Sequence, residues 1–320
     1  MPFGETLLYN ASKLIEVKSI DRDFEYVHDL VKKAVAKISD LQNEIDVYVH
    51  GSYANATNIF FPSNLEVCVE LKLPKYEFKM TKDYFIKHNL EYGPREFRED
   101  LFDALCDVVD RVTRTNNVAG QKCDLTEKCI IIPRHGNLKH AVEILPSVSF
   151  VLTEKSGTEF KGVMLYKDDG RPVKEGVRPG MEIATFPKLH QRNGQIKDVR
   201  TDGNFKRMVR LFKTLKTIAM RENPNDLYLG AGARGYFIEC LLFNVPDNLY
   251  KGGDLHDVFL RVINYLAHAS LHDFACQNLV WHLFSTAEEF WNEKDAGVFI
   301  KSIRMMYNET PDTRTELVLQ

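Results

Sequence analysis

The sequence lacks the features that mark membrane-spanning, secreted and zinc-binding proteins. None of its apolar runs is long enough to span a bilayer, and its first residues have neither the basic nor the apolar region of a signal peptide. Its six cysteines are scattered, and none forms a Cys-x-x-Cys pair or a zinc-like spacing with histidine. We therefore expect a cytoplasmic protein with reduced thiols and no membrane partner.

A dominant charge is missing as well. The 42 Lys and Arg residues nearly balance the 45 Asp and Glu residues, which gives a net charge of −3. Without an overall basic field, sequence-specific binding to nucleic acid is not expected. The net charge does not exclude a local basic cleft that binds nucleotides. The 320 residues are enough for a sizeable core and for one large or two ordinary domains.

Residues 47–71 carry the clearest pattern in the chain. The first four, VYVH, alternate as in a half-buried strand, and the Gly51-Ser52 pair ends that strand. A loop rich in Asn and Thr follows, up to Pro62. A Gly-Ser turn after a strand can offer backbone N–H groups and a hydroxyl to a polyphosphate, so Gly51 and Ser52 are candidate nucleotide-binding residues.

A second strand is predicted after this loop. Residues 65–71 alternate, with apolar side chains on one face and polar ones, including Asn64 and Glu66, on the other. Polar residues at i and i+2 of a strand lie about 7 Å apart at their Cα atoms. Two carboxylates at that spacing can bracket metal ions roughly 3.5–4 Å apart, which clamp the attacking and leaving oxygens of a phosphoryl or nucleotidyl transfer.

This order of Gly-Ser, loop and polar strand resembles the signature of the DNA polymerase β-like nucleotidyltransferase superfamily. The fuller pattern, GSYANATNI followed by SNLEVCV, resembles the bacterial cGAS/DncV-like nucleotidyltransferases (CD-NTases). Those enzymes join nucleoside triphosphates into cyclic oligonucleotide second messengers in anti-phage defence. The resemblance implies an α+β fold with a polymerase β-like palm of mixed sheet and helices, a C-terminal helical lobe, and a nucleotide cleft between them.

Residue 64 departs from the family pattern, which usually has a carboxylate at both ligand positions of this strand. Here the two positions are Asn64 and Glu66. An amide offers one oxygen and no charge, so two divalent cations would be held poorly. Three explanations are open: a substitution made to block catalysis, a weak natural enzyme, or a pseudoenzyme.

A later acid completes the metal set that the resemblance implies. HAVEIL, residues 140–145, is predicted to be a strand, and burying its single acid is costly unless the acid is paired, hydrogen-bonded or bound to metal. An edge strand with Glu143 in water is the structural alternative. Because VEILPS resembles the family's V-D-[IV]-V-P-[AS] segment, Glu143 is expected to bind metal with Glu66 and Asn64 and to activate the attacking hydroxyl.

The strongest helix is predicted over residues 204–221, where apolar residues form one stripe and Lys and Arg residues occupy the rest. Such a charged face is usually only solvated. FKRMVRLFK nevertheless resembles the family helix whose lysine reaches the triphosphate. Lys213 matches that lysine best and Lys206 second, and a flexible ammonium suits phosphate as a point charge.

Two further segments resemble the family. YFIECLLFNVP is predicted to be a helix in which Glu239 makes a structural salt bridge, and the serine that often helps to hold phosphate before it is Gly235 here. FPKLHQRNG, residues 186–194, is interpreted as a loop. Its His190 could contact nucleotide, although a lone histidine in a loop is more often structural.

The other elements follow from apolar periodicity. Helices are predicted over residues 23–39, 95–113, 255–270 and 284–308, and strands over 128–133 and 162–167. Loop or irregular structure is expected for most of residues 72–94 and 150–195. The predicted domains are the palm with an N-terminal bracing helix (1–195), a helical domain (196–308) and a flexible tail (309–320).

The resemblance predicts a nucleotidyltransferase that joins nucleoside triphosphates into cyclic or linear oligonucleotides and releases pyrophosphate, with Mg²⁺ or Mn²⁺ as cofactor. A separate effector or activator protein is the expected partner. Two alternatives are open. One is a catalytically impaired nucleotide-binding or regulatory protein of the same fold, in which Asn64 cannot anchor metal. The other is a nucleotidyltransferase that modifies RNA or protein.

Overall fold

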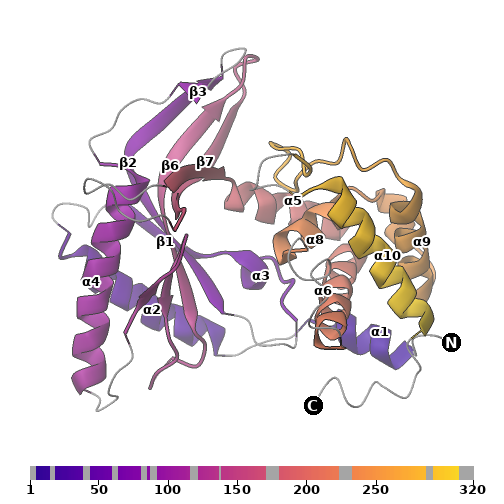
Figure 1. Ribbon diagram of the computed structural model, residues 1–320, viewed down its shortest axis with the longest axis horizontal. Helices are drawn as coiled ribbons and strands as arrows, with labels where there is room; N and C mark the ends of the chain where they lie inside the picture. Colours follow the sequence, from indigo (N-terminus) through magenta and orange to yellow (C-terminus); the bar gives the residue numbers. More distant parts are fainter. Residues whose placement is uncertain are drawn as a thin grey trace. The chain divides into compact units, whose positions relative to one another are not determined.

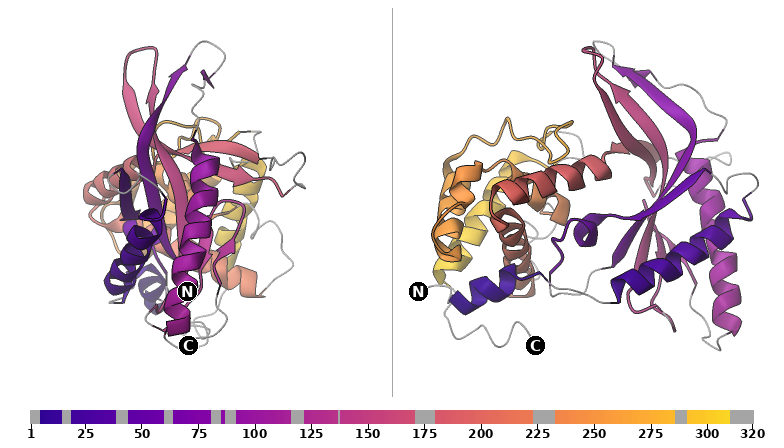
Figure 2. Two further views of the ribbon diagram at one scale, coloured as in Figure 1. Left: turned by 90° about the vertical axis from the view of Figure 1, so that its left-hand side faces the viewer. Right: turned by 180° about the vertical axis from the view of Figure 1, so that it is seen from behind.

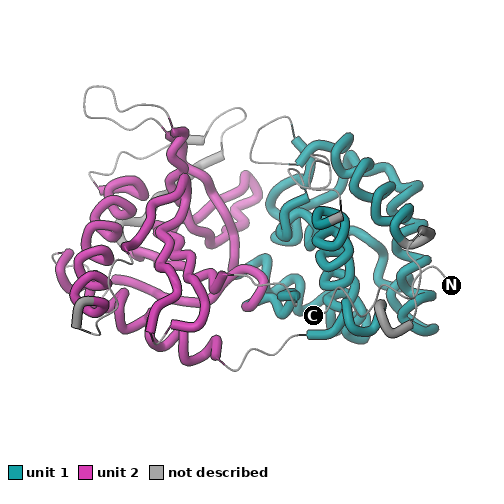
Figure 3. Tube along the Cα trace, turned by 60° about the horizontal axis from the view of Figure 1, so that its bottom comes forward, with its two compact units in different colours: residues 1–16, 54–62, 188–320 teal, residues 17–53, 63–187 magenta. Residues whose placement is uncertain are grey.

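A computed structural model describes residues 5–14, 19–38, 44–59, 64–80, 85–86, 92–115, 122–136, 138–170, 180–222, 233–285 and 291–309. The chain forms two compact units (Figure 3). The helical unit comprises residues 1–16, 54–62 and 188–320, and the sheet unit comprises residues 17–53 and 63–187. Both are discontinuous in sequence. The domain limits at residues 195 and 308 stay a prediction. The short segment 54–62 belongs to the helical unit, although its neighbours in sequence belong to the sheet unit.

The sheet unit contains one mixed sheet, to which the described residues contribute eight strands (Figure 1). Parallel pairing joins two of its long strands, and every other pair is antiparallel. The main strand order is β1 (Ile45–Val49), β2 (Leu65–Met80), β6 (Val142–Thr153), β5 (Ile130–Ile132) and β4 (Asp124–Leu125). In addition, β3 (Phe85–Ile86) pairs with β2, β7 (Glu159–Asp168) with β6, and β8 (Gly180–Thr185) with β7.

The parallel pair, β2 and β6, lies inside the sheet and is rich in β-branched residues. Val67, Val69 and Ile144 lie on one face of the pair and are fully buried, whereas Glu66 and Glu143 on the other face are half-buried. Two helices, α2 (Ile20–Val35) and α4 (Pro94–Thr115), pack against each other and against the sheet (Figure 2). Their predicted apolar stripes point inward, since Val27 on α2 and Phe97 on α4 are fully buried.

The helical unit is built around α6 (Asn204–Glu222), which packs against four other helices. These are α1 (Glu5–Ser12), α8 (Gly235–Phe243), α9 (Leu255–His268) and α10 (Glu293–Glu309). The unit also contains α5 (Pro187–Arg200) and a short 3₁₀ helix, η1 (Asp247–Tyr250). The apolar stripe predicted for α6 is buried along its whole length, which confirms that prediction (Phe205, Met208, Val209, Phe212, Leu215, Ile218).

The structure corrects the prediction that most of residues 72–94 and 150–195 are loop or irregular structure. β2 continues to Met80 and β6 to Thr153, and β7 and β8 follow, so residues 72–80 and much of 150–185 are strand. Pro74 and Lys75 break the apolar alternation after Leu73, and it resumes one position out of phase at Tyr76, Phe78 and Met80. Pairing with β6 resumes at Tyr76 after a register shift, so the displaced alternation of residues 76–80 was a local signal that the prediction missed.

The segment FPKLHQRNG is also not a loop, because Pro187 is the first residue of α5. Proline suits the first helical position, where no backbone donor is needed. The prediction failed because α5 has no apolar stripe. Similarly, Gly51 and Ser52 begin a short helix, α3 (Gly51–Ala54), directly after β1.

The C-terminal helix α10 begins at Glu293, later than predicted. Residues 310–320 of the predicted tail lie outside the described residues. Within the described ranges, no helix combines the length and the apolar character needed to cross a bilayer.

Candidate active site

The centre of the candidate site is a pair of carboxylates on neighbouring strands. In the parallel pairing of β2 with β6, Glu66 lies directly opposite Glu143, and both are half-buried. Neighbouring strands are about 4.8 Å apart, and residues in register point to the same face. The two acids that the sequence identified separately are therefore side by side.

Glu66 is closely associated with the Gly-Ser turn. Its Oε2 accepts a hydrogen bond of 3.1 Å from the backbone N–H of Ser52. Gly51 has a φ of +69°, and a Cβ at that position would lie 1.6 Å from the same Oε2. Only glycine can occupy this position without displacing the carboxylate. A backbone donor predicted for phosphate thus binds Glu66.

Asn64 lies just before β2 and contacts the other acid. Its Nδ2 donates a hydrogen bond of 2.7 Å to Oε1 of Glu143. The structure therefore gathers five of the predicted site residues in one place in the sheet unit: Gly51, Ser52, Asn64, Glu66 and Glu143.

These side chains can be tested as a metal site by their chemistry. Carboxylate and amide oxygens are the hard ligands that Mg²⁺ prefers. Among the residues that the structure describes, no group of three or more His, Cys, Asp or Glu is placed to hold a metal ion. The donor set is two acids and one amide, and the amide presents its nitrogen to Glu143. The set fits a hard divalent cation once the Asn64 amide turns its oxygen inward, with less negative charge than three carboxylates would provide.

The start of β6 is fixed by Asp23 of α2, a residue whose role the sequence did not reveal. Asp23 is fully buried. Its carboxylate accepts backbone hydrogen bonds from Lys139 and His140 and lies 2.7 Å from Nδ1 of His140. This anchors the chain three residues before Glu143. A signal was present, because Asp23 falls on the buried stripe of α2, four residues before Val27.

The two lysines predicted to bind triphosphate belong to the helical unit. Both are buried on α6. Nζ of Lys206 donates to Oε1 of Gln195 at 2.7 Å. Nζ of Lys213 lies 2.5 Å from Oε1 of Glu239 and 3.1 Å from Oγ1 of Thr57. The salt bridge predicted for Glu239 is thereby confirmed.

His190 joins the same cluster rather than lying in a loop. Its Nε2 is 2.6 Å from Oε2 of Glu239, and its ring stacks on Tyr236 with centroids 4.9 Å apart. Burial alone would raise the pKa of Glu239, but Lys213 and His190 outweigh that effect and hold the pKa below its usual range. Glu239 is therefore ionised at neutral pH.

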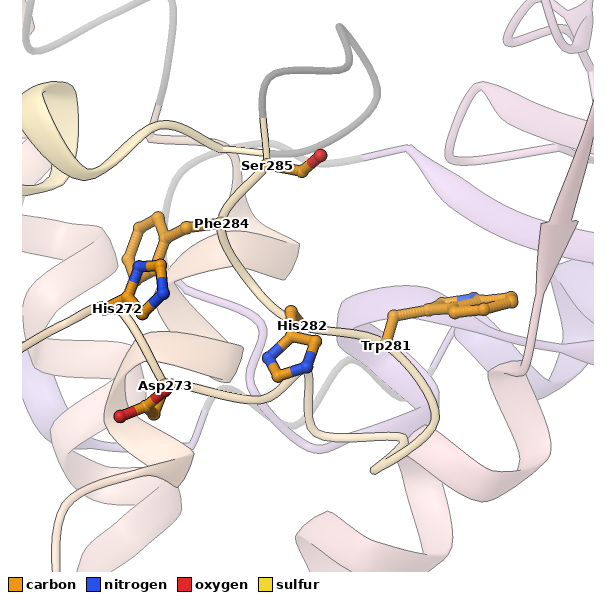
Figure 4. Close-up of a pocket in the computed structure, with 6 residues that line it drawn as sticks. All are labelled: His272, Asp273, Trp281, His282, Phe284 and Ser285. Atoms are coloured by element: carbon orange, nitrogen blue, oxygen red, sulfur yellow. The ribbon is translucent and has the colours of Figure 1, made fainter. Parts of the chain in front are cut away.

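The helical unit also has a cavity of about 360 Å³ that none of the predicted site residues lines (Figure 4). Its walls come from residues 272–285, between α9 and α10. In Figure 4 the Trp281 indole is directed away from the His272 and His282 rings. The cavity is thus separate from the Glu239 cluster.

Comparison with known proteins agrees with the geometry. Residues 192–308 match the family of cGAS/DncV-like nucleotidyltransferase C-terminal helical domains. A cyclic UMP-AMP synthase of Rhodothermus marinus is 29% identical over 281 residues, covering 86% of this chain and 88% of that protein. The cyclic nucleotide synthase CdnE01 of Staphylococcus haemolyticus is 28% identical over 292 residues, covering 84% and 86%. The chain is thus similar to the cGAS/DncV-like nucleotidyltransferases, in its C-terminal helical domain by the family match and over most of its length by these relatives.

The fold of the chain agrees with that of these synthases. The solved structure of the Rhodothermus marinus CdnE c-UMP-AMP synthase with Apcpp and Upnpp superposes with a TM-score of 0.76 at 24% identity, covering 96% of this chain and 97% of that one. The CdnE cyclic dinucleotide synthase of Elizabethkingia meningoseptica gives 0.71 at 22% identity, covering 94% and 97%. The predicted α+β fold, a mixed sheet with helices and a C-terminal helical domain, is confirmed.

Proposed function

We propose that this nucleotidyltransferase joins nucleoside triphosphates into cyclic oligonucleotides. The observation that carries the proposal is the pairing of Glu66 with Glu143 beside the Gly51-Ser52 turn. Support also comes from relatives that are themselves synthases of cyclic UMP-AMP and of other cyclic nucleotides. One solved neighbour holds the triphosphate analogues Apcpp and Upnpp, which supports nucleoside triphosphates as substrates.

The proposed reaction is a nucleotidyl transfer. A ribose hydroxyl oxygen of one nucleotide forms a bond to the α-phosphorus of another, the bond from that phosphorus to the bridging oxygen breaks, and pyrophosphate leaves. A second transfer closes the ring. In this proposal Glu143, which lies opposite Glu66 on the neighbouring strand, accepts the proton of the attacking hydroxyl. The Gly51 and Ser52 backbone and the Ser52 hydroxyl bind the leaving phosphates, and Lys213 and Lys206 neutralise the triphosphate.

The proposed reaction also needs a divalent cation. Glu66, Glu143 and Asn64 would hold Mg²⁺ or Mn²⁺, which supplies Lewis-acid stabilisation of the charge on the phosphate oxygens. We further propose that the product is a second messenger in anti-phage defence, made in the cytoplasm and recognised by a separate effector protein. Support for this role is the similarity of the chain to cyclic nucleotide synthases and of residues 192–308 to the cGAS/DncV-like C-terminal helical domain.

A second candidate is a nucleotide-binding or regulatory protein without turnover. Two contacts favour it. The Asn64 amide occupies one oxygen of Glu143, and Ser52 N–H, a predicted phosphate donor, is bonded to Glu66. Both contacts would have to rearrange before metal and triphosphate bind.

The test is incubation of the protein with labelled ATP, GTP, CTP and UTP and Mg²⁺ or Mn²⁺, followed by chromatography after phosphatase treatment. A product that resists phosphatase is expected, since a cyclic product has no terminal phosphate. Glu66→Gln should abolish it. Glu70→Gln is the matched control, because Glu70 lies on the same strand but binds Ser149. Bound nucleotide without any product, from both the wild type and Asn64→Asp, would favour the second candidate.

A further inference from the structure

We infer that Glu239 is a positioning residue, which holds the ammonium group of Lys213 in place for the triphosphate. The inference rests on the proposed function, in which Lys213 contacts the triphosphate and Glu239 has no part in the chemistry. It explains why an apolar helix carries an acid at its centre. In α8, the neighbours of Glu239 are buried apolar residues, and Glu239 itself is only 3% exposed.

The carboxylate of Glu239 is enclosed by four donor groups. Oε1 accepts from Lys213 Nζ at 2.5 Å and from Thr57 Oγ1 at 2.6 Å. Oε2 accepts from Asn55 Nδ2 at 2.9 Å and lies 2.6 Å from His190 Nε2. A buried carboxylate is tolerated only with such complete pairing. The four donors come from three segments of the helical unit: residues 54–59, α5 and α6.

The ammonium group of Lys213 is held just as closely. Besides Glu239, it donates to Thr57 Oγ1 at 3.1 Å and to the Thr57 carbonyl at 3.4 Å. Lys213, Glu239 and Thr57 thus form a closed triangle, because the Thr57 hydroxyl also donates to Glu239. Holding a long lysine side chain in one geometry removes the entropy cost of ordering it at the moment of binding.

The position in which Lys213 is held suits an anion. A Cβ on Gly235, the first residue of α8, would lie 3.3 Å from Lys213 Cε and 3.4 Å from Nζ. The ammonium group therefore lies beside the N-terminus of α8, where the helix dipole and the first backbone N–H groups favour negative charge. The bond to the Thr57 carbonyl is the longest of the three, so a phosphate oxygen can replace it at the least cost.

The same unit offers a control in a second ion pair, whose lysine is buried and whose acid is partly exposed. Lys197 is 7% exposed, and its Nζ donates to Asp247 Oδ1 at 2.7 Å and to the Val245 carbonyl at 2.7 Å. This pair resembles the Lys213–Glu239 pair in burial of the lysine and in geometry, but none of its contacts involves the Glu239 cluster. Breaking it measures what the loss of a partner of a buried lysine does to the unit in general.

The experiment measures the affinity of the whole 320-residue chain for inorganic tripolyphosphate and for ATP by calorimetry. The variants are Lys213→Met, Glu239→Gln, Glu239→Asp, the double variant Lys213→Met with Glu239→Gln, and the control Asp247→Asn. Lys213→Met and Glu239→Gln should each weaken binding about tenfold or more, since each removes or misplaces one charge-assisted contact. The double variant should bind no more weakly than Lys213→Met alone, because Glu239 acts through Lys213.

Two further results are expected. Glu239→Asp keeps the charge and should retain part of the affinity, whereas Asp247→Asn should lower the unfolding temperature and leave the affinity unchanged. Losses that add up in the double variant, or an affinity that is unchanged or raised in Glu239→Gln, would overturn the inference. So would wild-type binding in Lys213→Met, or no binding by the wild type. A wild type that binds with this coupling but makes no cyclic product would overturn the proposed synthesis and leave the inference standing.

Discussion

The carboxylate of Glu66 lies so close to Gly51 that a methyl group on residue 51 would be 1.6 Å from Oε2. Gly51 also has a φ of +69°, in the left-handed region where residues with a side chain are strained. Glycine is thus required at this position for two independent reasons, and one of them depends on the side chain that we propose as a metal ligand.

Gly51→Ala is expected to cost about 2–5 kcal/mol of stability, the sum of left-handed strain and overpacking against Glu66, and to abolish product formation. Chemical unfolding and the nucleotide assay measure the two effects. Gly203→Ala is the control, because Gly203 has a φ of +79° with no atom within 4 Å of its Cβ position. It should cost only about 1–2 kcal/mol. Equal losses in the two variants would show that Glu66 does not restrict residue 51.

Asn64→Asp should make stability dependent on Mg²⁺. The new carboxylate would face Glu143, where the amide donates a hydrogen bond of 2.7 Å, so like charges would repel until a cation is bound. We expect a lower unfolding temperature in EDTA, recovery with millimolar Mg²⁺, and faster product formation. Thermal unfolding with and without Mg²⁺ is the measurement.

The control for this change is Asn292→Asp, which replaces an amide that donates to Asp295 at 2.6 Å on an exposed surface. It creates the same kind of acid–acid contact away from the site, and no Mg²⁺ dependence is expected. If Asn64→Asp responds to Mg²⁺ no more than this control does, residues 64 and 143 do not share a cation.

The stability of the protein should fall between about pH 6.5 and pH 4 because of His50. Burial lowers the pKa of His50 to about 4, whereas the unfolded chain has the ordinary value near 6.5. Below pH 6.5 the unfolded state therefore binds more protons, so the contribution of His50 is complete above that pH and is lost as the pH falls through about 4.

Urea unfolding midpoints at about pH 7.5 and pH 5 measure this loss. His50→Gln, which cannot titrate, should show a smaller difference between the two midpoints than the wild type. The exposed His282 serves as the control, and His282→Gln should behave like the wild type. An unchanged difference in His50→Gln would exclude His50 as the group responsible.

Asp23→Asn should destabilise the sheet unit and impair catalysis together. The change removes a buried charge that holds two backbone N–H groups and the His140 ring, which is expected to cost about 3–5 kcal/mol. Asp21→Asn, an exposed acid in the same first turn of α2, should be neutral within about 0.5 kcal/mol. Unfolding by urea compares the two, and similar effects in both variants would rule out the anchoring role.

The sequence predicted those parts of the site that lie in short, strongly patterned segments. Glu66 and Glu143 each lie in a strand with a clear apolar pattern, so each could be identified from its own segment. The pairing of the two strands then places them opposite one another. The apolar stripe of α6 was equally clear. The extension of β2 to Met80 was missed because Pro74 interrupts the alternation, which then resumes one position out of phase with the first part of the strand.

Contacts between segments that are distant in sequence could not be predicted from local sequence patterns. Asn55 and Glu239 are 184 positions apart, and neither the loop nor the apolar helix around them indicates the hydrogen bond between them. Asp23 gave a weak signal, an acid on an apolar stripe, but nothing in α2 identified its partners at residues 139 and 140. Local periodicity predicts which face is buried, not what it is buried against.

The grouping of residues 54–62 with the helices has a consequence for how the protein is made. Asn55 and Thr57 leave the ribosome more than 180 residues before the carboxylate that they bind. At synthesis rates of 5–20 residues per second, roughly 10–40 s separate the two events. Residues 188–320 produced alone would lack two of the four donors around Glu239. The helical unit therefore completes its core late in synthesis, and it needs a strip of chain that was made first.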